Sequence, residues 1–447
     1  MTTKPGLDFG RVMPLFTITF VDVLGLTLIL PLLHLYAAVY GATPLQIGLV
    51  AAAFPLAQLV GVPIMGALSD RYGRKPVLLV SQVSTFIGFL MLASAHSLEM
   101  VILSRIVDGL FGANLATAQA AIADMTDEKT RTQGLGLTGA AFGLGFLFGP
   151  AISLISLEFS SSLAMPALIA AGYSALSIVL TVFSFKETLP AIRRSASAFP
   201  RRDVLLNPLR MLRLPQVNYL LGLMFAQQVV FFAFESLLGL FTLSRLGLLG
   251  EGNSLIFIYV GFILVYVQVR LIGRWSRKYG ERKLVFLALG TLAVGLLLLA
   301  ATPDQPNPFY IQRQVEASLR TMAPSSTEAI IGSIPITLPS ESHRGLGGII
   351  WFLIAIIPLT IGAGLIRPAL NSLMLKQAQA GDAGTILGVS TSVVSLANAV
   401  APLIGGLIFQ VSGAAAPFAI GGIVMALLLV ISLWAIRTQP AVPLPQT

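Results

Sequence analysis

Long apolar runs recur along this chain and constrain its fold more than any other feature. A helix that crosses the hydrocarbon core of a bilayer needs about 20 consecutive, mostly apolar residues. Only 11% of the 447 residues are charged, whereas soluble domains carry about 25%. The pattern predicts an all-α, polytopic membrane protein with twelve spans. They lie near residues 12–36, 46–69, 77–95, 99–122, 134–157, 163–185, 217–243, 254–273, 284–301, 348–373, 385–411 and 415–437.

The spans fall into two groups of six, separated by a basic stretch with several prolines. We therefore divide the chain into an N-terminal bundle at 1–188, a linker at 189–215 and a C-terminal bundle at 216–447. Membrane proteins keep Lys and Arg on the cytoplasmic side. With the N-terminus inside, 22 of the 28 cations fall in inside loops and tails, and only four fall outside. Both termini and the linker are expected in the cytoplasm.

A short polar loop between the second and third spans carries a dense motif. Residues 66–75 read GALSDRYGRK. Gly73 supplies the positive φ that a tight turn needs, and Asp70 can face the N-terminus of a helix. A weaker copy, GRWSRKYGERK, begins at Gly273, 207 residues further on. We interpret the loop as a conformational latch made of Gly66, Asp70, Arg71, Gly73, Arg74 and Lys75. On charge alone, it would be only a solvated marker of the inside.

Other features repeat between the two halves with a different offset. Pro150 in the fifth span corresponds to Pro402 in the eleventh, 252 residues later. The second half therefore holds about 45 extra residues between its loop motif and Pro402, and we place them at 303–347, outside the membrane. Gln312 to Met322 are predicted to form a short helix there. We expect this insertion to be an accessory segment.

Ionisable residues inside spans are costly and therefore indicate function. Asp22 lies in the first span, Arg105 and Asp108 share a face of the fourth, and Glu235 lies in the seventh. We assign proton coupling to these four residues. The structural alternative is that Arg105 pairs with Asp108 or Asp22 and only fixes helix packing.

Further residues are candidates for a central cavity or for hinges. The cavity candidates are Asn114, Gln119, Gln227, Phe231, Phe234 and Asn371. The hinge candidates lie in spans five and eleven, where small residues flank a proline: Gly145, Gly149, Pro150 and Pro402. Such faces allow close helix approach, and proline can bend a helix. Ordinary helix packing explains each residue taken singly.

Several kinds of chemistry are excluded or disfavoured by the sequence. The chain has no cysteine and only three histidines, without metal-ligand spacing. It has no Walker A sequence, nucleophile elbow or HExxH motif. We expect no cofactor, no metal and no enzymatic activity. The net charge of +9 is explained by membrane topology and not by nucleic-acid binding.

The N-terminal half resembles the tetracycline exporters and other drug:proton antiporters of the major facilitator superfamily. The resemblance rests on the 66–75 loop, on Asp22 to Gly25, on Arg105 and on Gly145-x-x-x-Gly149-Pro150. It implies the major facilitator fold, with twelve helices in two pseudo-symmetric halves of six. It also implies that the Asp70 loop latches the halves, that Arg105 takes part in proton coupling and that transport is outward. A monomer in the bacterial inner membrane is expected.

The sequence departs from the exporters at several positions. Ser153 and Leu154 replace two glycines of the span-five signature, His34 stands where a second proline is common, and Asp108 and the insertion are additional. The leading hypothesis is proton-coupled export of an amphipathic small molecule, with protons and membrane lipids as further partners. Lipid translocation or solute uptake within the same superfamily stays open, as does a non-transporting receptor or scaffold.

Overall fold

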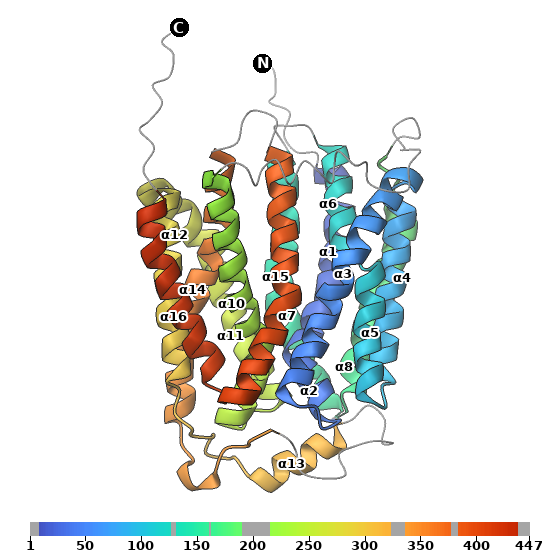
Figure 1. Cartoon of the computed structure of the whole chain (residues 1–447). Helices are drawn as coiled ribbons and strands as arrows, with labels where there is room; N and C mark the ends of the chain where they lie inside the picture. Colours follow the sequence, from blue (N-terminus) through green and yellow to red (C-terminus); the bar gives the residue numbers. More distant parts are fainter. Residues whose placement is uncertain are drawn as a thin grey trace.

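Two bundles of membrane-spanning helices stand side by side in the computed structural model (Figure 1). It describes residues 9–126, 131–160, 162–189, 215–322, 336–376 and 383–436. The predicted linker therefore lies almost wholly outside the described residues. The first helix begins and the last helix ends on the same side of the bundle, and α13 (Gln312–Thr321) lies across the opposite side (Figure 1).

The N-terminal half contains six crossings. Its helices are α1 (Phe9–Ile29) continued by η1 (Leu30–Leu32) and α2 (Leu33–Ala38), α3 (Pro44–Tyr72), α4 (Arg74–Ala93), α5 (Leu98–Phe111) with α6 (Asn114–Met125), α7 (Arg131–Phe159) and α8 (Ala164–Ser184). The fourth crossing is broken at Gly112 and Ala113, where a continuous helix was predicted. Ser81 Oγ donates to Phe111 O at 2.6 Å and accepts from Ala113 N, and Gln58 Nε2 donates to Gly112 O. These neighbours satisfy the backbone groups that the break frees within the membrane.

The C-terminal half contains six further crossings. Its elements are α10 (Pro215–Leu246), α11 (Gly250–Tyr266), η3 (Val267–Leu271), α12 (Ile272–Ala300), α14 (Gly347–Lys376), α15 (Ala383–Ser412) and α16 (Ala416–Ala435). The run Gly250–Ala300 is 51 residues long, or about 77 Å of helix. That is enough for two membrane crossings, and the charged second copy of the loop motif lies between them. Gly280, with φ 74°, breaks it where the second copy of the loop motif predicts a turn. The predicted twelve crossings are thereby confirmed.

The two halves contact each other most extensively through two helix pairs, α3 with α15 and α7 with α11. Glycines permit the close approach in both. A Cβ at Gly48 of α3 would collide with Pro402 O, and one at Gly261 of α11 would lie 2.8 Å from Phe146 O. Large apolar side chains such as Phe183 and Trp434, each more than 80% exposed, cover the outer surface, as a lipid-facing bundle requires.

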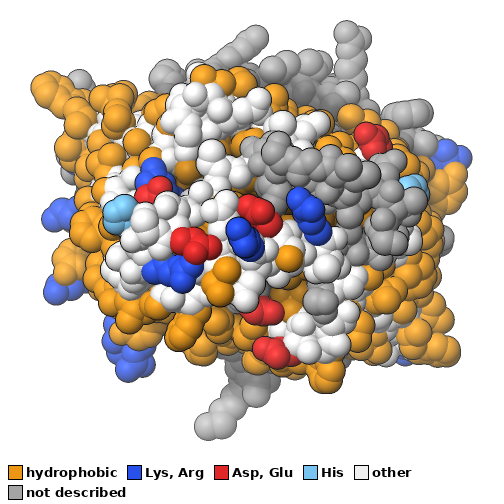
Figure 2. Space-filling model, turned by 90° about the horizontal axis from the view of Figure 1, so that it is seen from below, with side chains coloured by type: hydrophobic (Ala, Val, Ile, Leu, Met, Phe, Trp, Pro, Cys, Tyr) orange, Lys and Arg blue, Asp and Glu red, His pale blue; other side chains and the backbone are white. Residues whose placement is uncertain are grey.

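The insertion packs against the bundle and touches both halves. It includes the predicted helix as α13, whose Val315 and Leu319 are buried. Asn307 N donates to Leu246 O in the C-terminal half, and Leu163 N of the N-terminal half donates to Met322 O at 2.9 Å. Acidic and basic side chains are interspersed over this face (Figure 2). We call residues 303–322 and 336–346 the strap, because they join the two halves on one side.

Candidate functional site

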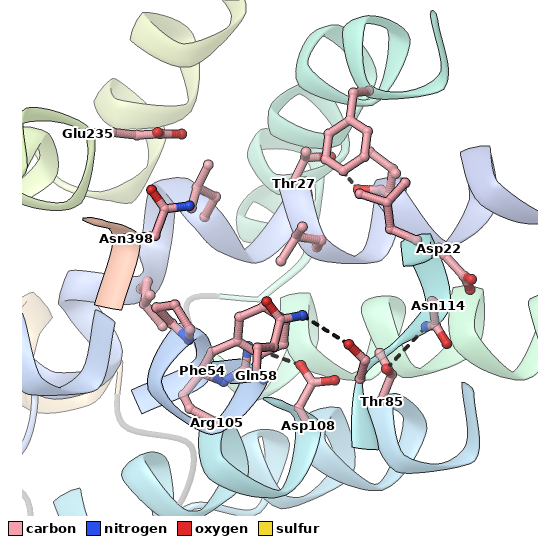
Figure 3. A pocket seen from close by; sticks show the side chains of 18 of the residues that line it. Asp22, Thr27, Phe54, Gln58, Thr85, Arg105, Asp108, Asn114, Glu235 and Asn398 are labelled. Carbon is pink, nitrogen blue, oxygen red and sulfur yellow. Dashed lines mark hydrogen bonds and ion pairs between the residues drawn. The ribbon is translucent and has the colours of Figure 1, made fainter. Parts of the chain in front are cut away.

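A cavity of about 400 Å³ lies between the two halves. Figure 3 shows Glu235 and Asn398 of the C-terminal half on one side, and Asp22 and Asn114 of the N-terminal half on another. Most of the remaining wall is aliphatic or aromatic, with phenylalanines from five helices. The aromatic positions are Phe54, Phe89, Phe142, Phe146, Phe232 and Phe257. An apolar wall with a few charged groups suits an amphipathic organic molecule.

Arg105 and Asp108 form an ion pair at the cavity wall. Arg105 Nη1 lies 3.5 Å from Asp108 Oδ2, and both side chains are about 4% exposed. The guanidinium also lies over the Phe89 ring, 5.5 Å from its centroid. Two guanidinium nitrogens, Nε and Nη2, are buried and have no hydrogen-bond partner among the described residues. Arg105 therefore pairs with Asp108, as one sequence alternative held, and keeps unused donors beside the cavity.

Asp22 lines the same cavity, and its carboxylate forms no ion pair with a described residue. Gln82 Nε2 donates to Ser177 Oγ at 2.7 Å and lies 3.5 Å from Asp22 Oδ2. Asp22 Oδ1 is buried and has no partner in the part of the chain that is described. Asn114 Nδ2 donates to Thr85 Oγ1 at 3.4 Å, and Asn114 Oδ1 is also unpartnered. A water could donate to either oxygen, and the carboxylate of Asp22 could instead take up a proton.

Glu235 supplies the acidic group of the opposite wall. It lines the cavity with Phe232, Ser236 and Gly239, which follow one face of α10 at helical spacing. Within the described residues, no ion pair involves its carboxylate. On α14, Arg367 also lines the cavity without an ion pair to any described residue. These two opposite charges are therefore both available to a ligand.

The other predicted cavity residues lie outside the lining of this cavity. Phe231 and Phe234 form a ring pair with centroids 5.8 Å apart, and Phe234 packs on Phe418 in the core of the C-terminal half. Gln227 is buried and donates to Met224 O. Gln119 and Asn371 are also outside the cavity lining, so only Asn114 of the six predicted residues lies there. Phe231 and Phe234 pack in the core, whereas Glu235 lies on the face of α10 that lines the cavity.

The floor of the cavity contains a hydrogen-bonded contact between the halves that sequence reasoning missed. His34 Nε2 lies 3.2 Å from Asn253 Nδ2 on α11, and Thr242 Oγ1 donates to Asn253 Oδ1 at 2.6 Å. All three side chains are at most 4% exposed. The His34 ring rests on Gly239, where a Cβ would collide with it. We call His34, Asn253 and Thr242 the gate network. Its signal in the sequence was a histidine within the first apolar run.

Further contacts close the same end of the cavity. Leu45 N donates to Gln410 Oε1 at 3.2 Å, joining α3 to α15. Ser254 Oγ donates to Ser153 Oγ at 3.3 Å, joining α11 to α7. Ser153 is one of the residues that replace glycine in the span-five signature. These contacts join the two halves on the α13 side, which the strap also crosses (Figure 1).

The 66–75 loop is held within the N-terminal half. Gly73 has φ 107°, as its turn requires. Arg74 is almost buried and pairs with Asp70 at 2.5 Å and with Asp124 at 2.8 Å. Glu187, and not Asp70, caps α4, because it accepts from Arg74 N at 2.9 Å and Lys75 N at 3.1 Å. Gly66 and Arg71 show no contact with the C-terminal half among the described residues.

The predicted hinge residues have two different environments. Gly145 and Gly149 pack against α1, where Thr27 Oγ1 donates to Gly145 O at 2.9 Å. Pro150 follows them inside α7. These glycines therefore fit two helices of one half together. Pro402 instead lies at the contact between the halves, against Gly48 of α3.

Comparison with known proteins agrees with this architecture. A sequence model described as Major Facilitator Superfamily matches residues 15–312. The tetracycline resistance protein, class H, of Pasteurella multocida is 25% identical over 88% of both chains. Multidrug resistance protein 2 of Bacillus subtilis is 24% identical over 91% of this chain and 90% of its own. The crystal structure of the human organic anion transporter MFSD10 (TETRAN) has a TM-score of 0.67 at 21% identity, covering 96% of this chain and all of that one.

Proposed function

Because this chain belongs to the major facilitator superfamily and is therefore a multi-pass membrane transporter, we propose that it exports an amphipathic small molecule in exchange for protons. The observation that carries the proposal is a pair of carboxylates, Asp22 and Glu235, on opposite walls of one cavity, neither of which has an ion partner among the described residues. They belong to the first helix of each half. A carrier that exchanges a proton for a substrate needs such a group where both can reach it.

Asp22 is the main proton site in this proposal. Its unpartnered Oδ1 accepts the proton, and the carboxylate alternates between exposure to one side of the membrane and to the other. Asp108 is held by Arg105 and serves as a second acid of the same wall. The proton affinity of a buried carboxyl changes with nearby charge and hydration. Movement of Arg105 during the cycle therefore alters proton binding at this wall.

Glu235 and Arg367 bind the substrate in the C-terminal half. Neither group has an ion partner in the part of the chain that the structure describes. A carboxylate and a guanidinium of this kind suit a molecule with a basic group, an acidic group or both, and the phenylalanines suit its apolar part. The names of similar proteins, which refer to tetracycline, multidrug resistance and organic anions, support this class. The proposal does not depend on one particular drug.

In this proposal, transport occurs because the cavity is closed first on one side of the membrane and then on the other. The described state is closed on the α13 side by the gate network, and the opposite state requires its separation. With the chain ends in the cytoplasm, the closed side faces outward and substrate enters from inside. The cavity floor is then the exit, and the gate network lies on the route out.

Proteoliposomes with an imposed pH gradient test the proposal. The probes are tetracycline, a lipophilic organic cation and an amphipathic organic anion, each in radiolabelled form. We expect movement of at least one probe against its gradient, opposite to proton flow, with dissipation by a protonophore. Movement of solute together with protons would replace export by uptake. Absence of gradient-driven movement for every probe, with folded protein and intact vesicles, would contradict the proposal for these three substrate classes.

A further inference from the structure

Two pseudo-symmetric loops differ in how their positive charges are balanced. In the N-terminal half, Arg74 pairs with Asp70 and Asp124, and Lys75 Nζ donates to Val182 O at 2.7 Å. Glu187 also caps the helix that follows. This loop is therefore largely compensated by its own half.

The corresponding loop of the C-terminal half shows no comparable ion pairs of its cations within the described residues. It turns at Gly280, the counterpart of Gly73, but Arg277 stands at the position of Asp70 and Arg274 at that of Ala67. Arg274, Arg277 and Lys278 are exposed. Among the described residues, none of the three forms an ion pair with a carboxylate, and Lys278 lies 5.1 Å over the Tyr279 ring. A cluster of uncompensated cations at the membrane surface attracts anionic headgroups.

A lipid-facing groove leads to these cations. It has a volume of about 350 Å³ and lies between the α11–η3 segment and α14, with only apolar or aromatic side chains in its wall. The wall consists of Tyr259, Phe262, Ile263, Tyr266, Val267, Leu271, Ile357 and Ile361. From Tyr259 to Leu271 the helix rises about 18 Å, close to the depth of one hydrocarbon leaflet, about 15 Å.

The groove and the cations lie on one helix face. Leu271 lines the groove, and Arg274 and Lys278 follow it at i+3 and i+7 in the helical segment before Gly280. The cations are therefore at the membrane-surface end of the groove, on the side where α1 begins (Figure 1). This is the arrangement that a phospholipid needs, with its chain along the helix and its headgroup at the surface.

We propose that this groove, with Arg274 and Lys278, is a binding site for one anionic phospholipid. Its acyl chain lies along Tyr259 to Leu271, and its phosphate-containing headgroup contacts the two cations. The uncompensated charge selects an anionic lipid over a zwitterionic one. The site lies on the lipid-facing surface of the helix bundle and does not depend on the proposed transport reaction.

Lipid titration of the purified full chain tests the proposal with an internal control. The melting temperature is followed in mixed micelles as dioleoyl phosphatidylglycerol is added. Replacing both cations, in Arg274→Gln with Lys278→Gln, is expected to weaken binding, so that the lipid concentration at the half-maximal shift rises about 30-fold. The matched control, Arg71→Gln with Lys75→Gln, removes the same charge from the pseudo-symmetric loop. It should stay within about twofold of wild type, because these two residues do not adjoin the groove.

A groove variant separates headgroup attraction from binding of a whole lipid. Ile357 is 38% exposed, so Ile357→Trp can fill the groove without replacing a core residue. It should abolish saturable stabilisation by phosphatidylglycerol while leaving the cations intact. Dioleoyl phosphatidylcholine and inorganic phosphate should give no saturable shift.

Three results would overturn the site. They are a wild-type midpoint in the Arg274/Lys278 variant, an equal loss in the Arg71/Lys75 control, or the same shift with phosphate as with lipid. Native mass spectrometry of the same samples, counting retained phosphatidylglycerol, provides a second readout that is independent of melting. Neither readout uses transport, so failure of the proposed function leaves this test intact.

Discussion

At the scale of single residues, the cavity combines acids that differ in their partners. Asp108 has Arg105 at 3.5 Å, whereas one oxygen of Asp22 is buried and unpartnered in the described chain. An acceptor without a donor is costly in a dry site, and protonation or hydration relieves the cost. This difference is why we place the main proton site at Asp22.

Asp22→Asn is expected to abolish concentrative, pH-driven transport while preserving folding. The amide keeps the size of the carboxyl but cannot bind and release a proton near neutral pH. Substrate binding should fall less than about tenfold, because Glu235 and Arg367 are on the other wall. Proton release on substrate addition to solubilised protein is the measurement. Unchanged release and undiminished gradient-driven transport would remove Asp22 from the mechanism.

His34→Ala is expected to shift the equilibrium toward the state that is open on the α13 side. The change leaves the buried Asn253 amide without its partner, which costs about 1–3 kcal/mol, or about 5- to 150-fold in population. His34→Gln, which retains an amide within the gate, should restore much of the closed population.

Spin labels can report this shift directly. The chain has no cysteine, so Ser94→Cys and Glu251→Cys, both exposed on the closed side in different halves, can be labelled selectively. Longer label-to-label distances are expected in His34→Ala and also in Gly239→Ala, whose added Cβ displaces the ring. Wild-type distance distributions in both variants would show that the gate network does not hold the halves together.

At the scale of elements, two acids near the 66–75 loop have different roles, one in capping α4 and the other in pairing with Arg74. Glu187 caps α4 through two backbone amides, whereas the Asp70 side chain is 57% exposed and shares Arg74 with Asp124. The first contact supports folding. The second contact is exposed, so Asp70 could change partners when the two halves move relative to each other.

Glu187→Gln should therefore affect stability, whereas Asp70→Asn should affect transport. Removing the charge at the α4 N-terminus in Glu187→Gln should lower stability by about 1 kcal/mol. Asp70→Asn should leave the melting temperature nearly unchanged while lowering the transport rate severalfold. Melting in detergent and initial transport rates at equal protein amounts are the measurements. If Asp70→Asn transports at the wild-type rate, the loop is only a topological marker.

The sequence predicts elements better than it predicts which helix faces meet. Spans are read from apolar length, which is local, so all twelve are found. The break at Gly112 depends on Ser81 and Gln58 from other helices, and nothing within span four reports it. On α10, Phe231 and Phe234 have the composition of a cavity face but pack on Phe418. Glu235 was identifiable because a charge inside a span is costly wherever it points.

The strap offers an element-scale prediction about the closed side. The sequence suggested an accessory segment, but Tyr310, Val315 and Leu319 are buried against the bundle. Replacing 306–343 by a Gly/Ser linker should therefore lower the melting temperature while leaving a folded transporter, because most helix contacts are retained. Size-exclusion profiles and melting of the deleted protein check this. Complete loss of folded protein would mean that the strap is part of the core.

At the scale of the whole molecule, the orientation in the membrane is a prediction from charge. Ser195→Cys in the predicted linker should react with an impermeant thiol reagent only after the membrane is opened. Ser342→Cys in the strap should react in intact cells. The cysteine-free background makes each label unambiguous. The reverse pattern of labelling would invert the molecule and the direction of the proposed transport.

The strap also makes the two ends of this pseudo-symmetric carrier energetically unequal. It adds the Leu163–Met322 hydrogen bond to the closed side. An idle carrier of this kind rests in one state for most of the time and leaves it only when a ligand supplies the difference in free energy. In the proposed orientation, the resting state is open to substrate from the cytoplasm. Proton leakage without substrate is then slow, because the empty protein rarely changes to its other state.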